Sequence, residues 1–450
     1  MSNATESHDV VNAKPLPLSH QILFWLMACI PVIVLVAFFL KFTVNAPSSD
    51  DFDAILGFLN RYFPENRWNA FFSLTELHNE HRIILTRLLA WLNAILFGKV
   101  SFTGLTVIAN SSLLLLTGVL IRLGRKEGLR DFWLIPVLSL ILVCQDSSNM
   151  LIAMFGLQNL IVHAFAAVSF LTWNRSRLWS AVFGTLAVCT SSCGLLVFPI
   201  LAAYEIYSTI TSEKKAIVSG FRQAVTTNAA FPLSLCVCVW GLYFWGYHSP
   251  PHHPSLLTGF KIPHRFAQYI VLLMGTPLSQ FGHPMTHVIG VSFLCLMCAV
   301  LWKSDWRKHS TLICLIFFEL GTMFIIASAR CGFGSGHPYN TRYRIIALTL
   351  WACTYLLAGD LLRQRLTSAR FLTVGIWLAS LAIVFNLLTA RYSIPGFQKL
   401  SQSMSEQLSP QQANLRTIEG SEHFYEVAIE SQSKGLFHWQ YLRQSDPTPQ

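Results

Sequence analysis

Long apolar runs separated by short polar connections extend along the chain from Gln21 to Ala390. A membrane-spanning helix needs about 20 mainly apolar residues, because the hydrocarbon core of a bilayer is about 30 Å thick. The pattern therefore predicts eleven spans. They cover residues 21–43, 101–123, 132–143, 157–173, 178–189, 195–207, 231–247, 285–302, 310–327, 345–362 and 371–390.

Two stretches do not fit a simple count of spans. The run 83–97 is too short to cross a bilayer comfortably, and Thr86, Ala90 and Asn93 give it a weakly polar stripe at helical spacing. We expect it to lie along the outer membrane surface. Residues 178–207 would form a helix of about 45 Å, but the polar segment 190–194 interrupts them. Two short spans fit this stretch better.

Basic residues fill the short connections on one side of this arrangement, including Arg122, Arg125, Lys126 and Arg175. Positive charge favours the cytoplasmic side. The pattern predicts a cytoplasmic segment 1–20, a membrane domain 21–390 with a first periplasmic loop at 44–100, and a polar periplasmic tail at 391–450. We expect a multi-pass protein of a bacterial inner membrane, with the N-terminus in the cytoplasm and the C-terminus in the periplasm.

Composition supports a membrane protein, because 53% of the residues are hydrophobic and only 12% are charged, against about 25% charged residues in soluble domains. The net charge of +10 is spread over short loops. This distribution reflects membrane topology and argues against a nucleic-acid partner. The predicted fold class is an all-α polytopic membrane protein with surface helices in its first outer loop.

Three carboxylates follow the first span, at Asp50, Asp51 and Asp53. Solvated acids that cap a helix would explain them. Alternatively, Asp51, or less favourably Asp50, takes the proton from an acceptor hydroxyl. As a further alternative, the three acids bind a divalent cation, Mg²⁺ or Mn²⁺, although no cofactor is required.

Ionisable residues also precede the surface helix and the tenth span. Glu80, His81 and Arg82 either anchor the helix at the headgroups or carry chemistry, with Glu80 or His81 moving a proton and Arg82 pairing with phosphate. The glycine-rich segment 330–344 carries three arginines on the predicted outer side, against the topological preference. We expect this segment and a polar outer turn to contact the substrate, through Arg330, His337, Arg342, Tyr343 and Gln158. Alternatively, the arginines bind lipid headgroups and the polar side chains of the turn satisfy its backbone.

The order of these parts resembles that of GT-C membrane glycosyltransferases of the protein-mannosyltransferase and aminoarabinose-transferase type. The matching residues are Asp50-Asp51-Phe52-Asp53, then His81 through Leu96-Phe97-Gly98, then Leu123-Gly124-Arg125-Lys126. Asn79-Glu80-His81-Arg82, Phe155-Gly156-Leu157-Gln158 and Arg330-Cys331-Gly332-Phe333-Gly334 with Arg342-Tyr343 are similar to a set of bacterial GT-C-like membrane proteins.

This resemblance implies a GT-C-like enzyme of the glycosyltransferase class, with an outward-facing site. It implies transfer of a sugar from a polyprenyl-phosphate donor to a cell-envelope glycan, lipid or protein, such as lipopolysaccharide, by an inverting displacement. Membrane lipids are expected partners. Three alternatives stay open, an O-antigen polymerase or ligase, a lipid-linked sugar flippase and a noncatalytic membrane scaffold. A flippase needs polar residues at bilayer depth, and Glu319 is the main intramembrane acid.

Overall fold

The computed structural model describes residues 17–62, 67–79, 81–143, 146–212, 223, 225–248, 258–333, 337–406 and 421–438. These residues form helices and contain no named β-strand. Eight helical segments are long and apolar enough to cross a membrane. They are α1 (Leu18–Phe42), α5 (Phe102–Lys126), α8–α9 (Ala153–Asn159 and Ile161–Thr172), η3–α11 (Ser192–Leu196 and Val197–Ser212), α16 (His283–Lys303), α17 (Ser310–Arg330), α18 (Arg344–Arg363) and α19 (Ser368–Glu406).

Each of these eight segments coincides with one of the eleven predicted spans. The other three predicted spans coincide with shorter apolar helices, which are η2–α6 (Asp131–Leu134 and Ile135–Ile141), α10 (Arg177–Thr190) and α13 (Ala230–Phe244). The prediction of an all-helical polytopic membrane protein is therefore confirmed for the described part of the chain.

Helix α4 (Ile84–Phe97) is the predicted surface helix, and its polar stripe faces the protein. Thr86 and Asn93 are buried, and the Asn93 side chain accepts a 2.7 Å hydrogen bond from the backbone N–H of Ser101. Leu96 and Phe97 are exposed on the other side. An inward polar face and an outward apolar face suit a helix that lies against lipid.

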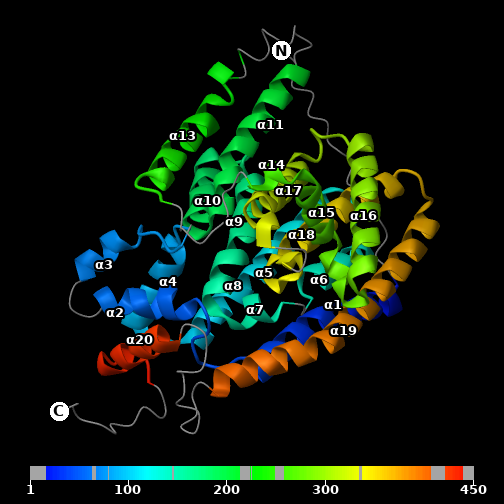
Figure 1. The fold of residues 1–450 in the computed structure, drawn as a ribbon. Coiled ribbons are helices and arrows are strands. Elements are labelled where there is room, and N and C mark those ends of the chain that lie inside the picture. The colour runs from blue at the N-terminus through cyan, green and yellow to red at the C-terminus, as the bar shows by residue number, and fades with distance from the viewer. Residues whose placement is uncertain are drawn as a thin grey trace, which may run out of the picture.

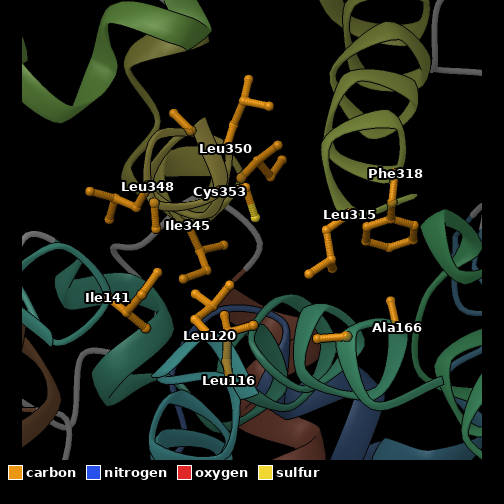
Figure 2. Close-up of a cluster of buried hydrophobic side chains, with 14 of the residues drawn as sticks. Leu116, Leu120, Ile141, Ala166, Leu315, Phe318, Ile345, Leu348, Leu350 and Cys353 are labelled. Carbon is orange, nitrogen blue, oxygen red and sulfur yellow. The ribbon is translucent and has the colours of Figure 1, made fainter. Parts of the chain in front are cut away.

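The central core forms where α5, α6, α9, α17 and α18 meet (Figure 2). The labelled side chains are almost all aliphatic, and they pack against one another between these helices. The residues labelled there are Leu116, Leu120, Ile141, Ala166, Leu315, Phe318, Ile345, Leu348, Leu350 and Cys353.

A second cluster joins the first outer loop to the C-terminal region. The loop contains η1 (Phe52–Gly57), α2 (Phe58–Tyr62) and α3 (Arg67–Ser73), and α20 (Ser421–Ser433) packs against η1 (Figure 1). The rings of Phe52 and Phe424 stack with centroids 4.8 Å apart. Asn60 donates a 2.9 Å hydrogen bond to the carbonyl of Val427. The first outer loop and helix α20 therefore pack together.

Two boundaries differ from the predicted ones. Helix α19 lies beside α1 along the flank of the bundle and continues past Ala390 to Glu406 (Figure 1). The connection between the predicted spans 231–247 and 285–302 contains α14 (Thr258–Lys261), α15 (Pro263–Gly275) and η4 (Thr276–Phe281), and α15 packs against α16. The apolar face of α15, with Leu272 and Leu273 buried, accounts for this packing.

Candidate functional site

Asp51 is completely buried and binds the start of helix α8. Its Oδ1 accepts a 2.7 Å hydrogen bond from the backbone N–H of Met154, and its Oδ2 accepts one of 3.1 Å from Ser48. The first N–H groups of a helix have no partner within it, so a carboxylate there is stabilised. Burial nevertheless raises the pKa of Asp51 to about 7. This anchoring accounts for its position; its assignment as a base stays a prediction.

The neighbouring acids lie in a more open setting. Asp50 is partly exposed and accepts a 3.3 Å hydrogen bond from the hydroxyl of Ser49. Asp53 pairs with His423 of α20 at 2.6 Å. Asp50 and Asp53 also act on His78, although burial is the larger influence and lowers the pKa of that imidazole. His78 had no part in the sequence prediction.

His81 lies beside His78 in a short bridge of the outer loop. Its Nδ1 is 3.0 Å from the hydroxyl of Ser192, at the start of η3. The polar break predicted at 190–194 therefore faces the predicted histidine. Glu80 lies outside the described residues.

The guanidinium of Arg82 clamps two segments of backbone. Its Nε donates a 2.7 Å hydrogen bond to the carbonyl of Tyr243, and its terminal nitrogens bind the carbonyls of Thr75 and Trp245. These three acceptors occupy three of the five N–H donors of the guanidinium. Arg82 as a phosphate ligand stays a prediction, and the contacts show a structural role.

Helices α7 (Ser147–Leu151) and α8 form a short corner beneath the arginine-rich loop. Asp146 caps α7, accepting a 3.0 Å hydrogen bond from the N–H of Asn149 and another from its side-chain amide. Asn149 also donates to the carbonyl of Arg342 at 2.9 Å. The corner therefore binds the backbone of the arginine-rich loop. Gly156 has no side chain, which allows α8 to lie close to the carbonyl of Asn149.

Asp146 was missed by the sequence prediction. It is buried, and desolvation raises the pKa of its carboxyl, although a hydrogen bond from Thr341 and the charges of Arg344 and Arg342 oppose this. The available signal was the polar run 145–149 directly after an apolar one. Nothing in that run alone indicates that two arginines lie beside it.

Arg342 carries its guanidinium between two aromatic rings. The carbon Cζ lies 5.2 Å from the ring centroid of Phe155 and 5.1 Å from that of Tyr343. Its Nε is buried and has no hydrogen-bond partner in the described part of the chain. Gln158 is buried on α8, one turn after Phe155. The structure thus places Arg342 against Phe155 of α8, the helix that also carries Gln158.

A polar cavity of about 390 Å³ opens next to this corner. Arg344 lines it and donates a 3.0 Å hydrogen bond to the hydroxyl of Ser279. Seven further lining residues carry a hydroxyl or amide group, namely Ser147, Gln280, Tyr339, Thr341, Thr389, Tyr392 and Ser393. A cavity of this size holds a small polar ligand.

Two further predicted substrate contacts, Arg330 and His337, stay predictions. Arg330 ends α17, and its Cζ lies 5.5 Å from the ring centroid of Phe333. The side chain of His337 lies outside the described part. Asp51 binds the α8 backbone one residue before Phe155, which contacts Arg342. Asp51 and Arg342 therefore contact neighbouring residues of helix α8.

Glu319 forms a sealed pair within the bundle. Its Oε1 lies 2.9 Å from Nδ1 of His163, and both side chains are buried. The rings of Phe170 and Phe318 pack close to the pair. His163 is the partner of one carboxylate oxygen of this intramembrane acid, while Oε2 is buried without a hydrogen-bond partner in the described part of the chain.

The acids of the first loop do not converge on a metal position among the described residues. A three-ligand group occurs instead near the basic end of the bundle, formed by Glu127, His309 and Asp360. The ammonium of Lys308 already lies 2.7 Å from Asp360 and 3.5 Å from Glu127. The ammonium of Lys308 therefore provides a positive charge beside both carboxylates.

The described structure defines a multi-pass, all-helical membrane protein with a polar site between short helices. No family model and no curated protein matches the sequence. The chain is similar in structure to the crystal structure of the Archaeoglobus fulgidus oligosaccharyltransferase in the apo form, with a TM-score of 0.45 and 12% sequence identity. The match covers 96% of this chain and 61% of that one, so the chain spans less than two thirds of its length.

Proposed function

We propose that the corner formed by α7, α8 and the Arg342 loop transfers a sugar from a polyprenyl-phosphate donor to a cell-envelope acceptor. The observation that carries this proposal is the guanidinium of Arg342. Aromatic faces cover it and its Nε lacks an acceptor, so a phosphate oxygen would restore the missing hydrogen bond. Arg344, at the adjacent cavity, adds a second cation.

The chemistry follows from charge. The acceptor oxygen attacks the anomeric carbon, the bond from that carbon to the phosphate oxygen breaks, and the configuration inverts. The leaving lipid phosphate gains negative charge, which Arg342 and Arg344 stabilise. A donor with a long lipid chain suits a site at the ends of membrane helices, where its phosphate is paired and its tail stays in lipid.

The acceptor proton needs a base near those arginines. Asp146 fits this role, because its raised pKa favours proton uptake and Thr341, which lines the cavity, is hydrogen bonded to it. In this proposal Asp51 is a positioning residue that fixes α8, and Asp50 is the exposed carboxylate of the first loop. No metal ion is needed for these steps.

The test compares envelope glycans from cells that lack the chain with glycans from cells carrying single variants. Wild-type protein and Asp53→Asn should restore a sugar that deletion removes, because Asp53 pairs with His423 away from the corner. Asp146→Asn should fail to restore it at equal membrane abundance. If deletion leaves the masses of the envelope glycans unchanged, the proposed transfer is refuted. If Asp146→Asn restores the sugar fully, only the assignment of Asp146 as the base is refuted.

A further inference from the structure

A second cavity, of about 360 Å³, lies at the opposite, basic end of the bundle. Three membrane helices meet there: α5 ends at Lys126, α9 ends at Thr172 and α17 begins at Ser310. The cavity is lined by Arg122, Leu123, Arg125, Lys126, Leu171, Asn174, Arg175 and Thr311. Four of these eight residues are cations, and none is an acid.

The four cations have no partner in the described part of the chain. Arg122, Arg125 and Arg175 are exposed and take part in no ion pair or side-chain hydrogen bond there. The neighbouring acid Glu127 is buried on another side, 3.1 Å from His309 and 3.5 Å from Lys308. Protein carboxylates thus leave the charge of this cavity uncompensated, and like charges around one concavity repel each other.

The apolar part of the lining indicates what the compensating anion is attached to. Leu123 and Leu171 form the apolar part of a cavity whose polar groups are cations, an amide and a hydroxyl. Because spanning helices end here, the cavity lies at the depth of lipid headgroups. Guanidinium groups match phosphate oxygens bidentately. An amphiphile with a phosphate headgroup matches this lining, because its phosphate pairs with the cations and its apolar part contacts the two leucines.

We propose that this cavity binds the phosphate headgroup of an anionic phospholipid. The site is separate from the sugar-transfer corner and does not depend on the proposed function. Clusters of basic side chains between membrane helices bind such headgroups, and each cation near an anionic surface contributes about 1 kcal/mol. Removing two of the four should therefore weaken binding roughly thirtyfold.

The test uses full-length protein in neutral detergent and measures the thermal unfolding midpoint during titration. The probes are short-chain phosphatidylglycerol, phosphatidylcholine with the same chains, and inorganic phosphate. Phosphatidylglycerol should raise the midpoint of the wild type, since a ligand that binds the folded state stabilises it. The double variant Arg125→Gln/Arg175→Gln should require roughly thirtyfold more of this lipid for the same shift.

The matched control is Lys303→Gln/Arg365→Gln, which removes two exposed cations from the same end of the bundle but outside the cavity. It should respond to phosphatidylglycerol as the wild type does. Equal loss in both double variants would overturn the proposal, because general surface charge would then explain the effect. A full response to inorganic phosphate alone would confirm a phosphate site but overturn its assignment to a lipid.

Discussion

The Oδ1 atom of Asp51 accepts a hydrogen bond of 2.7 Å from the backbone N–H of Met154. This bond joins the first outer loop to the start of α8, the helix that also supplies Phe155 to the guanidinium of Arg342. The first outer loop is therefore linked to the proposed phosphate site through two adjacent residues of α8, Met154 and Phe155.

The pH dependence of stability should report the burial of Asp51. Its pKa rises from 3.8 to about 7 on folding, so the folded protein binds this proton more tightly than the unfolded chain does. The free energy of unfolding of the wild type, relative to Asp51→Asn, should therefore fall as the pH rises from about 4 to about 7, and level off above that. Chemical unfolding in detergent at several pH values measures the difference. A difference that increases with pH would contradict it.

Substitution of Arg342 should impair transfer without unfolding the protein. Arg342→Gln removes the proposed phosphate ligand, and loss of such a group costs about a hundredfold or more in kcat. Arg342→Lys should lie between this variant and the wild type, because an ammonium lacks the planar fork. A transfer assay with a lipid-linked donor measures both. The control is Arg370→Gln, which replaces an exposed cation in the first turn of α19. Equal transfer rates in all variants would show that Arg342 does not bind the donor phosphate.

Substitution of Arg82 should affect stability. Arg82→Gln breaks hydrogen bonds to the carbonyls of Thr75, Tyr243 and Trp245, and bonds to a charged group contribute about 1.5–3 kcal/mol each. We expect a loss of about 2 kcal/mol or more in the free energy of unfolding. Arg61→Gln, which breaks an exposed 3.8 Å pair with Glu76, should change it by less than about 1 kcal/mol. An unchanged stability with a raised KM for donor would instead make Arg82 a phosphate ligand.

A pair of glycine substitutions tests the corner between α7 and α8. A Cβ at Gly156 would lie 2.4 Å from the carbonyl oxygen of Asn149, so Gly156→Ala must push the two helices apart. We expect a loss of about 1–3 kcal/mol and a lower transfer rate. Gly118→Ala meets nothing within 4 Å and should stabilise α5 by up to about 1 kcal/mol. Thermal unfolding compares the two; equal midpoints would show that the corner is loosely packed.

The sequence by itself determined the membrane helices. Bilayer thickness sets the length of a span and backbone hydrogen bonding requires a helix, so apolar runs such as 310–327 predict elements like α17 directly. The run 83–97 was separated from the spans by its length and its weakly polar stripe, and α4 is a short helix there. The packing of α15 against α16 was not predicted from the sequence, because an apolar helical face indicates that a helix packs but not which helix it packs against.

The tertiary structure alone decided the chemistry of each polar residue. Asp51 and Arg82 are as polar in sequence as Asp50 and Arg342, yet backbone groups from distant segments occupy the first two. The role of Asp146 depends on arginines nearly two hundred residues away, and their approach depends on the close contact at Gly156. Hydrophobic length is a local property of a chain. Whether a charge is satisfied depends on which distant groups packing brings to it.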